Sequence, residues 1–100
     1  MAIAMVQEFP VDPDDRSTTN YDSIKEGLNV DVDPPHGLIV HTAGFTGTGL
    51  FRIFDVWESE ADWQRFNQER LMPLVQPMIE SGEAPPTTEY TYELHDVVKG

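Results

Sequence analysis

The stretch LFRIFDVWESEADWQRF, residues 50–66, decides the fold because it contains a strand, the end of that strand and the start of a helix. Of the eight residues Leu50–Trp57, six are apolar or aromatic, and they alternate onto both faces of an extended chain. One face carries Phe51, Ile53 and Trp57, and the other carries Leu50, Phe54 and Val56. A strand that is apolar on both faces is expected to be covered on both faces.

The helix that follows this strand is predicted from its cap. Ser59 is a suitable N-cap residue, and Asp62 stands three residues later, where a capping-box partner is expected. From a start near Glu60, the apolar members of the helix are Trp63, Phe66, Leu71, Leu74, Val75, Met78 and Ile79. Pro73 and Pro77 must kink or split the helix because proline has no N–H to donate, so we expect a break near Met72.

The residues upstream predict a strand, a helix, a loop and a second strand. The first strand is expected at Ala2–Phe9. A helix follows, with N-cap candidates Ser17, Thr18 and Thr19 and an apolar stripe of Tyr21, Ile24 and Leu28. Two prolines make Asn29–Gly37 a loop, and Leu38–Phe45 reads as the second strand.

The remaining segments complete the pattern. Thr46–Gly49 is a hairpin turn, because glycine accepts the positive φ that tight turns require. Ser81–Thr87 is predicted as a linker loop, and Thr88–Val98 as the last strand. The order strand, helix, strand, strand, helix, strand predicts an α+β fold, namely a ferredoxin-like βαββαβ antiparallel sheet in one domain over residues 1–100.

The predicted sheet has more apolar surface than its own helices can cover. Both helices must lie on one face, which leaves apolar side chains on the other face without cover from this chain. A large bare apolar patch is unusual on a monomer, and a second copy packed sheet against sheet would cover it. We therefore predict a homodimer that forms a dimeric α+β barrel enclosing a cavity.

Composition and charge exclude several classes of partner. The chain has 18 acidic and six basic residues, a net charge of −12 and no cysteine. Binding of nucleic acid or of an anionic membrane is not expected, because phosphate contact needs clustered Lys and Arg. Disulfides and thiolate metal sites are excluded. The first apolar run is too short for a signal peptide or a membrane span, so a soluble cytoplasmic protein is expected.

The hexapeptide VWESEA at Val56–Ala61 follows an aromatic strand and precedes an amphipathic helix. This arrangement resembles the antibiotic-biosynthesis-monooxygenase-like (ABM-like) superfamily of dimeric α+β barrels. The likeness covers most of the chain in element order, and at residue level it runs from about Gly49 to Pro73. The resemblance implies a homodimer with a ligand pocket between sheet and helices, often working without metal or organic cofactor, on a scaffold that hosts unrelated chemistries.

The resemblance transfers residue by residue only in part. Trp57 matches the strand-end Trp of the cofactor-free quinone-forming members, but Ile53 stands where those members have an Asn. The haem-degrading branch uses a helix His and a first-strand Asn, whereas this helix has no His and the first strand has Gln7. What the resemblance implies is the scaffold and an aromatic pocket. The substrate-binding residues that form its wall would be Trp57, Trp63 and Phe66.

His41 and Asp55 are the candidate catalytic residues, and the length of the hairpin loop decides whether they meet. A three-residue loop, Gly47–Gly49, places His41 opposite Asp55; the same register pairs Ile39 with Trp57 and Phe45 with Phe51. A loop of two or four residues would place His41 opposite Phe54. We favour the odd loop, because a carboxylate on an apolar strand costs several kcal/mol unless it has a partner.

A His–Asp pair in an apolar cavity is a plausible general base, with the aspartate fixing the histidine tautomer. The alternative is a purely structural pair. Arg52 is predicted either to hold an anionic substrate group or to form a surface ion pair. Tyr90 and Tyr92 are predicted either to line the pocket as hydrogen-bond donors or to pack with solvated hydroxyls.

No metal site is predicted. The alternating aspartates of the loop at Asn29–Gly37 lack the Gly and the closing Glu of a calcium loop, and His36 is expected on the loop surface. The leading functional hypothesis is a cofactor-independent enzyme, a monooxygenase, cyclase or isomerase, acting on a hydrophobic or aromatic metabolite. The alternatives are a non-catalytic binder of an apolar ligand and a dimerisation module. A void of roughly 300 Å³ or more at His41 would favour enzyme or binder, and a filled interior would favour the module.

Overall fold

The computed structural model describes residues 1–11, 19–82 and 87–99. The elements are β1 (Ile3–Pro10), α1 (Thr19–Leu28), β2 (Leu38–Phe45), β3 (Leu50–Trp57), α2 (Glu60–Phe66), a π-helical segment η1 (Asn67–Leu71), α3 (Met72–Glu80) and β4 (Thr88–Glu93). This order confirms the predicted βαββαβ pattern. The N-cap candidates Ser17 and Thr18 lie outside the described residues.

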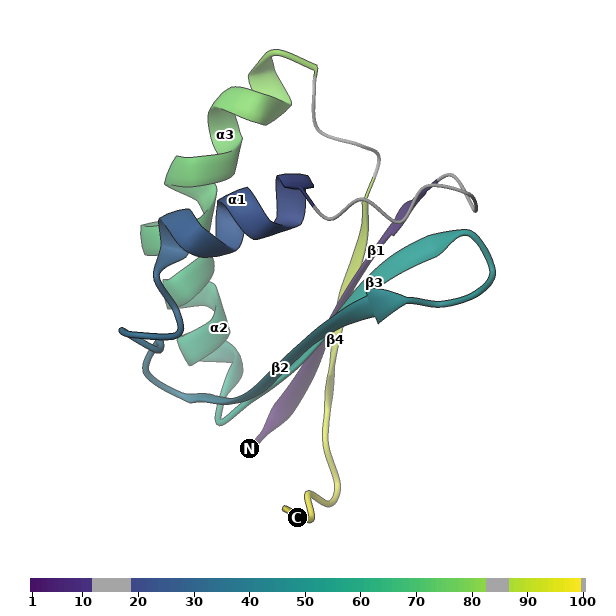
Figure 1. Ribbon diagram of the computed structural model, residues 1–100. Helices are drawn as coiled ribbons and strands as arrows, with labels where there is room; N and C mark the ends of the chain where they lie inside the picture. Colours follow the sequence, from purple (N-terminus) through teal and green to yellow (C-terminus); the bar gives the residue numbers. More distant parts are fainter. Residues whose placement is uncertain (12–18, 83–86, 100) are drawn as a thin grey trace.

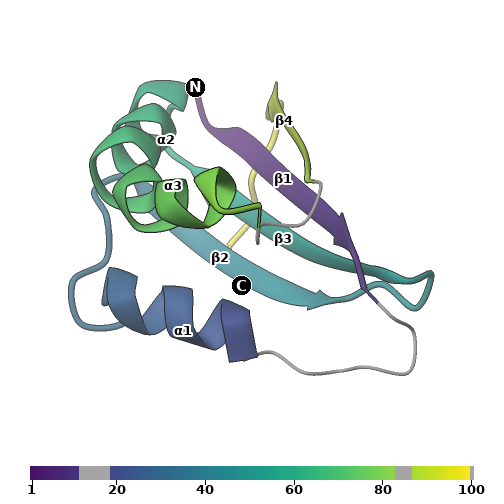
Figure 2. The same ribbon diagram turned by 90° about the horizontal axis from the view of Figure 1, so that it is seen from above.

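The four strands form one antiparallel sheet in the order β2-β3-β1-β4. Figures 1 and 2 show α1, α2 and α3 on one face of this sheet. On that face α1 lies near the β2 edge, and α2 and α3 lie next to α1. No helix of the described residues lies against the other face. None of the helices in the described parts of the chain is long and apolar enough to cross a membrane.

The β2–β3 hairpin has the predicted three-residue loop. His41 pairs with Asp55 and Phe45 pairs with Phe51, and the amide of Thr46 donates to the carbonyl of Leu50 at 2.9 Å. Gly49 has a φ of 85°, which only glycine adopts without strain. One predicted pair is wrong. A bulge between Leu38 and Val40 shifts the register, so that Leu38, and not Ile39, lies opposite Trp57.

The strand ends differ slightly from the prediction. β1 covers Ile3–Pro10 and is shifted by one residue. β4 ends at Glu93, five residues before the predicted end at Val98. The reason is its partner: the amide of Leu94 still donates to the carbonyl of Ala2, but β1 begins at Ile3 and offers nothing further to pair with.

The predicted helix break is confirmed. α2 ends at Phe66, η1 continues to Leu71, and α3 begins at Met72 with Pro73 in its first turn. Proline cannot donate to the carbonyl four residues earlier, and its ring clashes with that carbonyl, so the turn before Pro73 widens into a π segment. The amide of Met72 accordingly donates to the carbonyl of Asn67, five residues back.

The predicted cap of α2 is also confirmed. Ser59 has an extended backbone, and its Oγ accepts the amide of Asp62 at 3.2 Å. The hydroxyl of Ser59 in turn donates to Oδ2 of Asp62 at 2.9 Å, so both partners of the cap are satisfied.

The main core lies between the sheet and α2. Trp57 and Trp63 are each 1 % exposed, their ring centroids are 5.7 Å apart, and Phe66 lies 5.3 Å from Trp57. Ile3 and Met5 of β1 complete this cluster. These aromatic side chains supply most of the large apolar area that holds α2 on the sheet.

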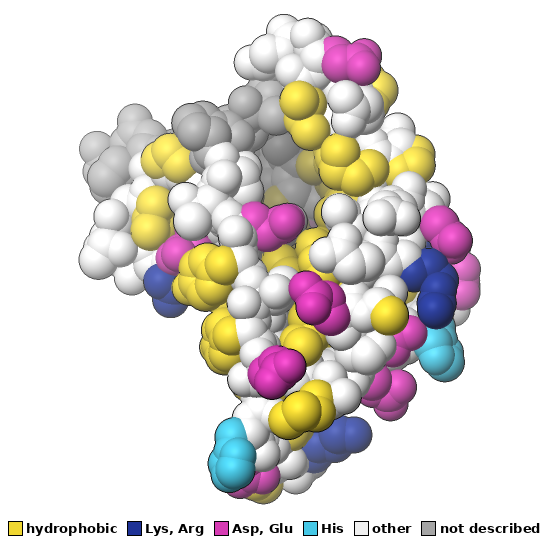
Figure 3. All heavy atoms as spheres, turned by 180° about the vertical axis from the view of Figure 1, so that it is seen from behind, with side chains coloured by type: hydrophobic (Ala, Val, Ile, Leu, Met, Phe, Trp, Pro, Cys, Tyr) yellow, Lys and Arg dark blue, Asp and Glu magenta, His cyan; other side chains and the backbone are white. Residues whose placement is uncertain are grey.

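The face of the sheet without helices carries exposed apolar side chains. Val40, Tyr90 and Tyr92 are 43 %, 46 % and 47 % exposed. The two tyrosine rings stack on one another with centroids 6.3 Å apart. Seen from behind, hydrophobic side chains lie among Asp and Glu side chains, while Lys and Arg are few (Figure 3), as a net charge of −12 requires.

Candidate active site

Four polar groups from three elements form one connected chain of hydrogen bonds. Oη of Tyr21 in α1 lies 2.6 Å from Nε2 of His41 in β2, and Nδ1 of His41 lies 2.6 Å from Oδ1 of Asp55 in β3. The indole N–H of Trp57 donates to Oδ2 of Asp55 at 3.3 Å. The predicted His41–Asp55 contact therefore exists, and it is extended by a residue at each end.

The contacts of Asp55 indicate which groups donate and which accept along this chain of hydrogen bonds. The residue is 4 % exposed, and its two oxygens accept from His41 and from Trp57. If Asp55 is an ionised carboxylate, which only accepts, then Nδ1 of His41 carries the hydrogen toward Asp55. In a neutral imidazole Nε2 then has a free lone pair, and it accepts the hydroxyl hydrogen of Tyr21.

Tyr21 remains a neutral phenol in this setting. Burial, and next the negative charge of Asp55, raise the pKa of the Tyr21 hydroxyl above its usual value, with Asp22 and Asp31 acting in the same direction. Each of these causes disfavours tyrosinate. The direction of the pKa shift agrees with Tyr21 as the donor to His41.

This chain of groups lies in the wall of a cavity of about 590 Å³ between the sheet and the helices. Tyr21, His41, Asp55 and Trp57 all belong to the lining. Most of the other lining side chains are apolar, among them Met5, Phe9, Ile24, Leu28, Ile53, Trp63, Phe66, Val75 and Met78. The volume is within the usual range of small-molecule sites and well above the size that separates a ligand cavity from a filled interior.

The predicted pocket residues divide into two groups. Trp57, Trp63 and Phe66 line the cavity, as predicted. Arg52 does not: it points to the opposite face, where its Nε and Nη2 donate to Oε2 of Glu8 at 2.8 and 2.6 Å. The reason is parity, because Arg52 lies one residue away from the cavity-facing positions of β3. The surface ion pair, and not the substrate contact, is what the structure contains.

Tyr90 and Tyr92 also point away from the cavity. They pair with Val6 and Ala4 of β1, whereas the cavity-lining residue Met5 has the opposite parity. Paired residues of neighbouring strands project to the same face, so both tyrosines lie on the side of the sheet without helices. They are packing groups with exposed hydroxyls, and the pocket-lining alternative is wrong for this protomer's cavity.

The sequence interpretation missed Tyr21 as a site residue. It counted Tyr21 as an apolar member of the α1 stripe, and the stripe does face the sheet. The hydroxyl of Tyr21 could have indicated a site residue, because a tyrosine on the buried face of a helix needs a polar partner. Gln7 and Glu89 were missed as well: both line the cavity, and Nε2 of Gln7 donates to Oε1 of Glu89 at 2.6 Å.

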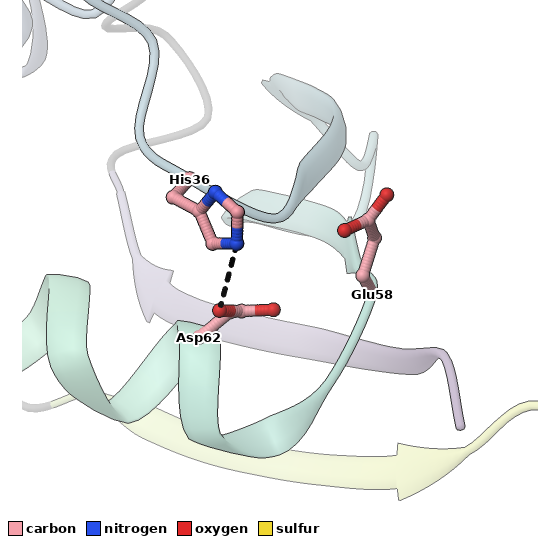
Figure 4. A group of neighbouring side chains, drawn as sticks. All are labelled: His36, Glu58 and Asp62. Carbon is pink, nitrogen blue, oxygen red and sulfur yellow. Dashed lines mark ion pairs between the residues drawn. The ribbon is translucent and has the colours of Figure 1, made fainter.

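A second group of titratable side chains lies outside this cavity. Figure 4 shows His36 from the loop before β2, Glu58 from the turn after β3 and Asp62 from α2; one ligand atom of each lies within 4.8 Å of the others. Asp62 is already engaged, because it accepts from Ser59 and from Arg65 and lies 3.8 Å from Nε2 of His36. These contacts fix the start of α2 against the start of β2.

Comparison with known proteins gives likeness in structure only. No protein-family model and no curated protein matches the sequence. Among solved structures, Rv0793 from Mycobacterium tuberculosis is similar at a TM-score of 0.69, with 14 % identity and coverage of 99 % of this chain and 100 % of that one. SnoaB from Streptomyces nogalater, a cofactor-independent oxygenase, is similar at a TM-score of 0.65, with 12 % identity and coverage of 99 % of this chain and 98 % of that one.

A third solved structure, from Caulobacter crescentus, belongs to a protein assigned provisionally to the antibiotic biosynthesis monooxygenases. It is similar at a TM-score of 0.68, with 13 % identity and coverage of 95 % of this chain and 91 % of that one. Identities this low establish a shared fold and carry no activity across. The predicted resemblance is confirmed at this level: the chain shares its ferredoxin-like α+β fold with these proteins.

Proposed function

We propose that this chain is an enzyme that removes a proton from a hydrophobic, aromatic metabolite bound in the cavity, with His41 as the general base and Asp55 as its partner. One observation carries the proposal: Nδ1 of His41 lies 2.6 Å from a buried aspartate in the wall of an apolar cavity of about 590 Å³. A base must be oriented and must lie beside the space where a substrate can bind, and His41 meets both requirements.

The surroundings support this role. Asp55 holds the imidazole in one tautomer and stabilises the imidazolium that forms when His41 takes a proton. Trp57, Trp63 and Phe66 form a rigid aromatic wall that suits a flat apolar ligand. The mostly apolar lining lowers the local dielectric constant and so strengthens the charge interactions on which proton removal depends.

The carbanion left in the cavity can react further in several ways. Oxygenation needs molecular oxygen as co-reactant: a CH₂ group and O₂ give a carbonyl group and water, and the substrate itself supplies the four electrons. SnoaB, whose fold is similar, is a cofactor-independent oxygenase, and oxygenation is therefore the first of the three outcomes to test. Each of the three begins with the same proton removal.

The proposal is tested at that first step. Anthrone, an aromatic ketone with an acidic CH₂ between two benzene rings, is incubated with the protein in D₂O under nitrogen, and hydrogen–deuterium exchange at the CH₂ is followed by NMR. We expect the wild type to accelerate exchange and His41→Ala to lose about 100-fold or more, the usual contribution of a general base. The matched control is His95→Ala, because His95 is exposed and outside the cavity lining.

The rival function is a binder that holds an apolar ligand without chemistry, and the cavity favours it as much as the enzyme. It predicts anthrone binding, measured by quenching of Trp fluorescence, with exchange rates equal in the wild type and in His41→Ala. The same result would end the case for catalysis. The cavity volume disfavours a dimerisation module, whose interior would be filled by its own side chains.

We also infer that a second copy of the chain covers the sheet face that carries Val40, Tyr90 and Tyr92. The support is their exposure on a face with no helix. Placing a charge there, as in Tyr92→Arg, should convert dimer to monomer in sedimentation velocity runs, whereas Val32→Arg, at an 80 % exposed loop position, should not. A wild type that sediments as a monomer at micromolar concentration would refute the dimer.

A further inference from the structure

The geometry points to Tyr21 as a further catalytic residue, the group that contacts the substrate and carries its proton to His41. This inference rests on the proposed function and adds to it. The first observation is that both ring nitrogens of His41 are occupied: Nδ1 by Asp55 and Nε2 by Oη of Tyr21, each at 2.6 Å. A ligand in the cavity reaches the lone pair of Nε2 only by displacing the hydroxyl of Tyr21 or through it.

Tyr21 has the correct valence for this task. Its oxygen donates its single hydrogen to Nε2 of His41 and keeps lone pairs that can accept a proton from a ligand. The side chain is only partly buried and belongs to the cavity lining, so its oxygen is within reach of a bound molecule. A neutral phenol is a poor base by itself, but it accepts a proton readily when it releases its own at the same time.

The position of the ring is fixed by packing. The Tyr21 ring is nearly parallel to the imidazole of His41, with an interplanar angle of 7°, and its centroid lies 5.4 Å from that of Phe51. α1 holds the residue from one side, and the β2–β3 pair holds its partners from the other. The hydroxyl is therefore presented at a defined point of the cavity wall, as a catalytic group requires.

The step is balanced. The bond between a substrate carbon and its acidic hydrogen breaks, and its electron pair stays on the carbon. That hydrogen binds to Oη of Tyr21 while the hydroxyl hydrogen of Tyr21 moves to Nε2 of His41. Tyr21 is neutral before and after, His41 becomes imidazolium, and Asp55 stabilises the positive charge through Nδ1–H. No electrons are exchanged with an oxidant.

The test compares Tyr21→Phe with the wild type in the anthrone exchange assay under nitrogen. The variant keeps the ring and removes the hydroxyl, so we expect the exchange rate at saturating anthrone to fall about 100-fold, with the apparent anthrone affinity nearly unchanged. His95→Ala is again the control, since His95 is exposed and outside the cavity lining. Circular dichroism verifies that each variant is folded.

The outcomes separate this inference from the proposed function. If His41→Ala loses exchange but Tyr21→Phe keeps it, Tyr21 is not a proton carrier and the base assignment stands. If neither variant differs from the wild type, the base assignment fails and the inference fails with it. Loss in both variants, with folding intact, supports the relay.

A second measurement uses the wild-type protein alone and does not depend on turnover. Long-range ¹H–¹⁵N NMR of the wild type at neutral pH reports which nitrogen of His41 carries hydrogen. The relay requires a neutral ring protonated at Nδ1, with Nε2 as a hydrogen-bond acceptor. A ring protonated at Nε2, which would donate to Tyr21, would overturn the inference.

Discussion

Removing the imidazole of His41 should destabilise the protein strongly, and replacing His41 and Asp55 together by apolar residues should restore part of the loss. The side chain of Asp55 is 6 % exposed, and His41 supplies the shorter of its two hydrogen bonds, 2.6 Å against 3.3 Å from Trp57. His41→Ala leaves this buried carboxylate with one neutral donor. Loss of a hydrogen bond to a charged group costs about 1.5–3 kcal/mol, and the burial of this carboxylate favours the upper end, about 3 kcal/mol.

The double variant His41→Leu, Asp55→Leu tests whether the pair is present for stability or for catalysis. It removes both polar groups and fills the space with apolar atoms, a change that is often neutral or stabilising for buried pairs. The indole N–H of Trp57 and the hydroxyl of Tyr21 lose their partners in this variant, so we expect its free energy of unfolding to return only to within about 2 kcal/mol of the wild type, with no exchange activity. Recovery of stability without recovery of exchange would indicate that the pair is retained for chemistry.

The assay is urea denaturation followed by Trp fluorescence, because Trp57 and Trp63 are both in the core and report on its opening. All variants are compared at one protomer concentration, since dimerisation makes apparent stability depend on concentration. A loss of about 3 kcal/mol corresponds to a Tm decrease of about 12–24 °C for a chain of this size. Arg52→Ala serves as the control, because its ion pair is at the surface and should contribute at most about 1 kcal/mol.

Two results would refute this reasoning. A loss below about 1 kcal/mol in His41→Ala would mean that Asp55 does not depend on His41 as a buried charge depends on its partner. A double variant as unstable as the single one would mean that the pair contributes to stability through packing that leucine cannot replace.

Three further predictions concern the core, one glycine and alkaline pH. Trp63→Ala should lower the free energy of unfolding by about 3–5 kcal/mol in urea denaturation, because the side chain is 1 % exposed; a loss under about 1 kcal/mol would contradict this core assignment. Gly37→Ala should lower the thermal midpoint, because the added Cβ would collide with the side chain of Asp62 and because the φ of Gly37 is +88°; an unchanged midpoint would contradict this packing. The raised pKa of Tyr21 stabilises the fold fully below the unfolded value near pH 10, and the contribution disappears as pH rises through the folded pKa. The urea midpoint should thus fall more steeply above about pH 10 in the wild type than in Tyr21→Phe, and parallel curves would refute the shift.

The hairpin demonstrates how far local patterns reach. Apolar residues on both parities predicted strands at Leu38–Phe45 and Leu50–Trp57, and the structure has both with these bounds. The need of a carboxylate on an apolar strand for a partner favoured the odd loop over loops of two or four residues, and the structure has the odd loop, with His41 opposite Asp55. Loop length and a period of two are local properties, so the sequence alone could predict this contact. The bulge that displaces Ile39 could not be predicted in this way, because no residue type marks it.

The break in the second helical segment was equally predictable, since Pro73 lacks a donor wherever the helix lies. The end of β4 was not predictable from its own residues, because a strand continues only while its neighbour offers partners, and β1 begins at Ile3. The fate of Arg52 was open for the same reason. Glu8, 44 residues away in sequence, becomes its partner only when β1 lies beside β3.

The sequence by itself thus determined the strands, the hairpin register, the helix break and the His41–Asp55 pair, because each follows from spacing and from backbone chemistry within a few residues. The tertiary structure alone decided that Tyr21 covers His41 and that a cavity of about 590 Å³ remains beside them. The angle at which α1 lies across the sheet is set by packing between distant segments. No local pattern encodes that angle, and it is this angle that brings a third element to the site.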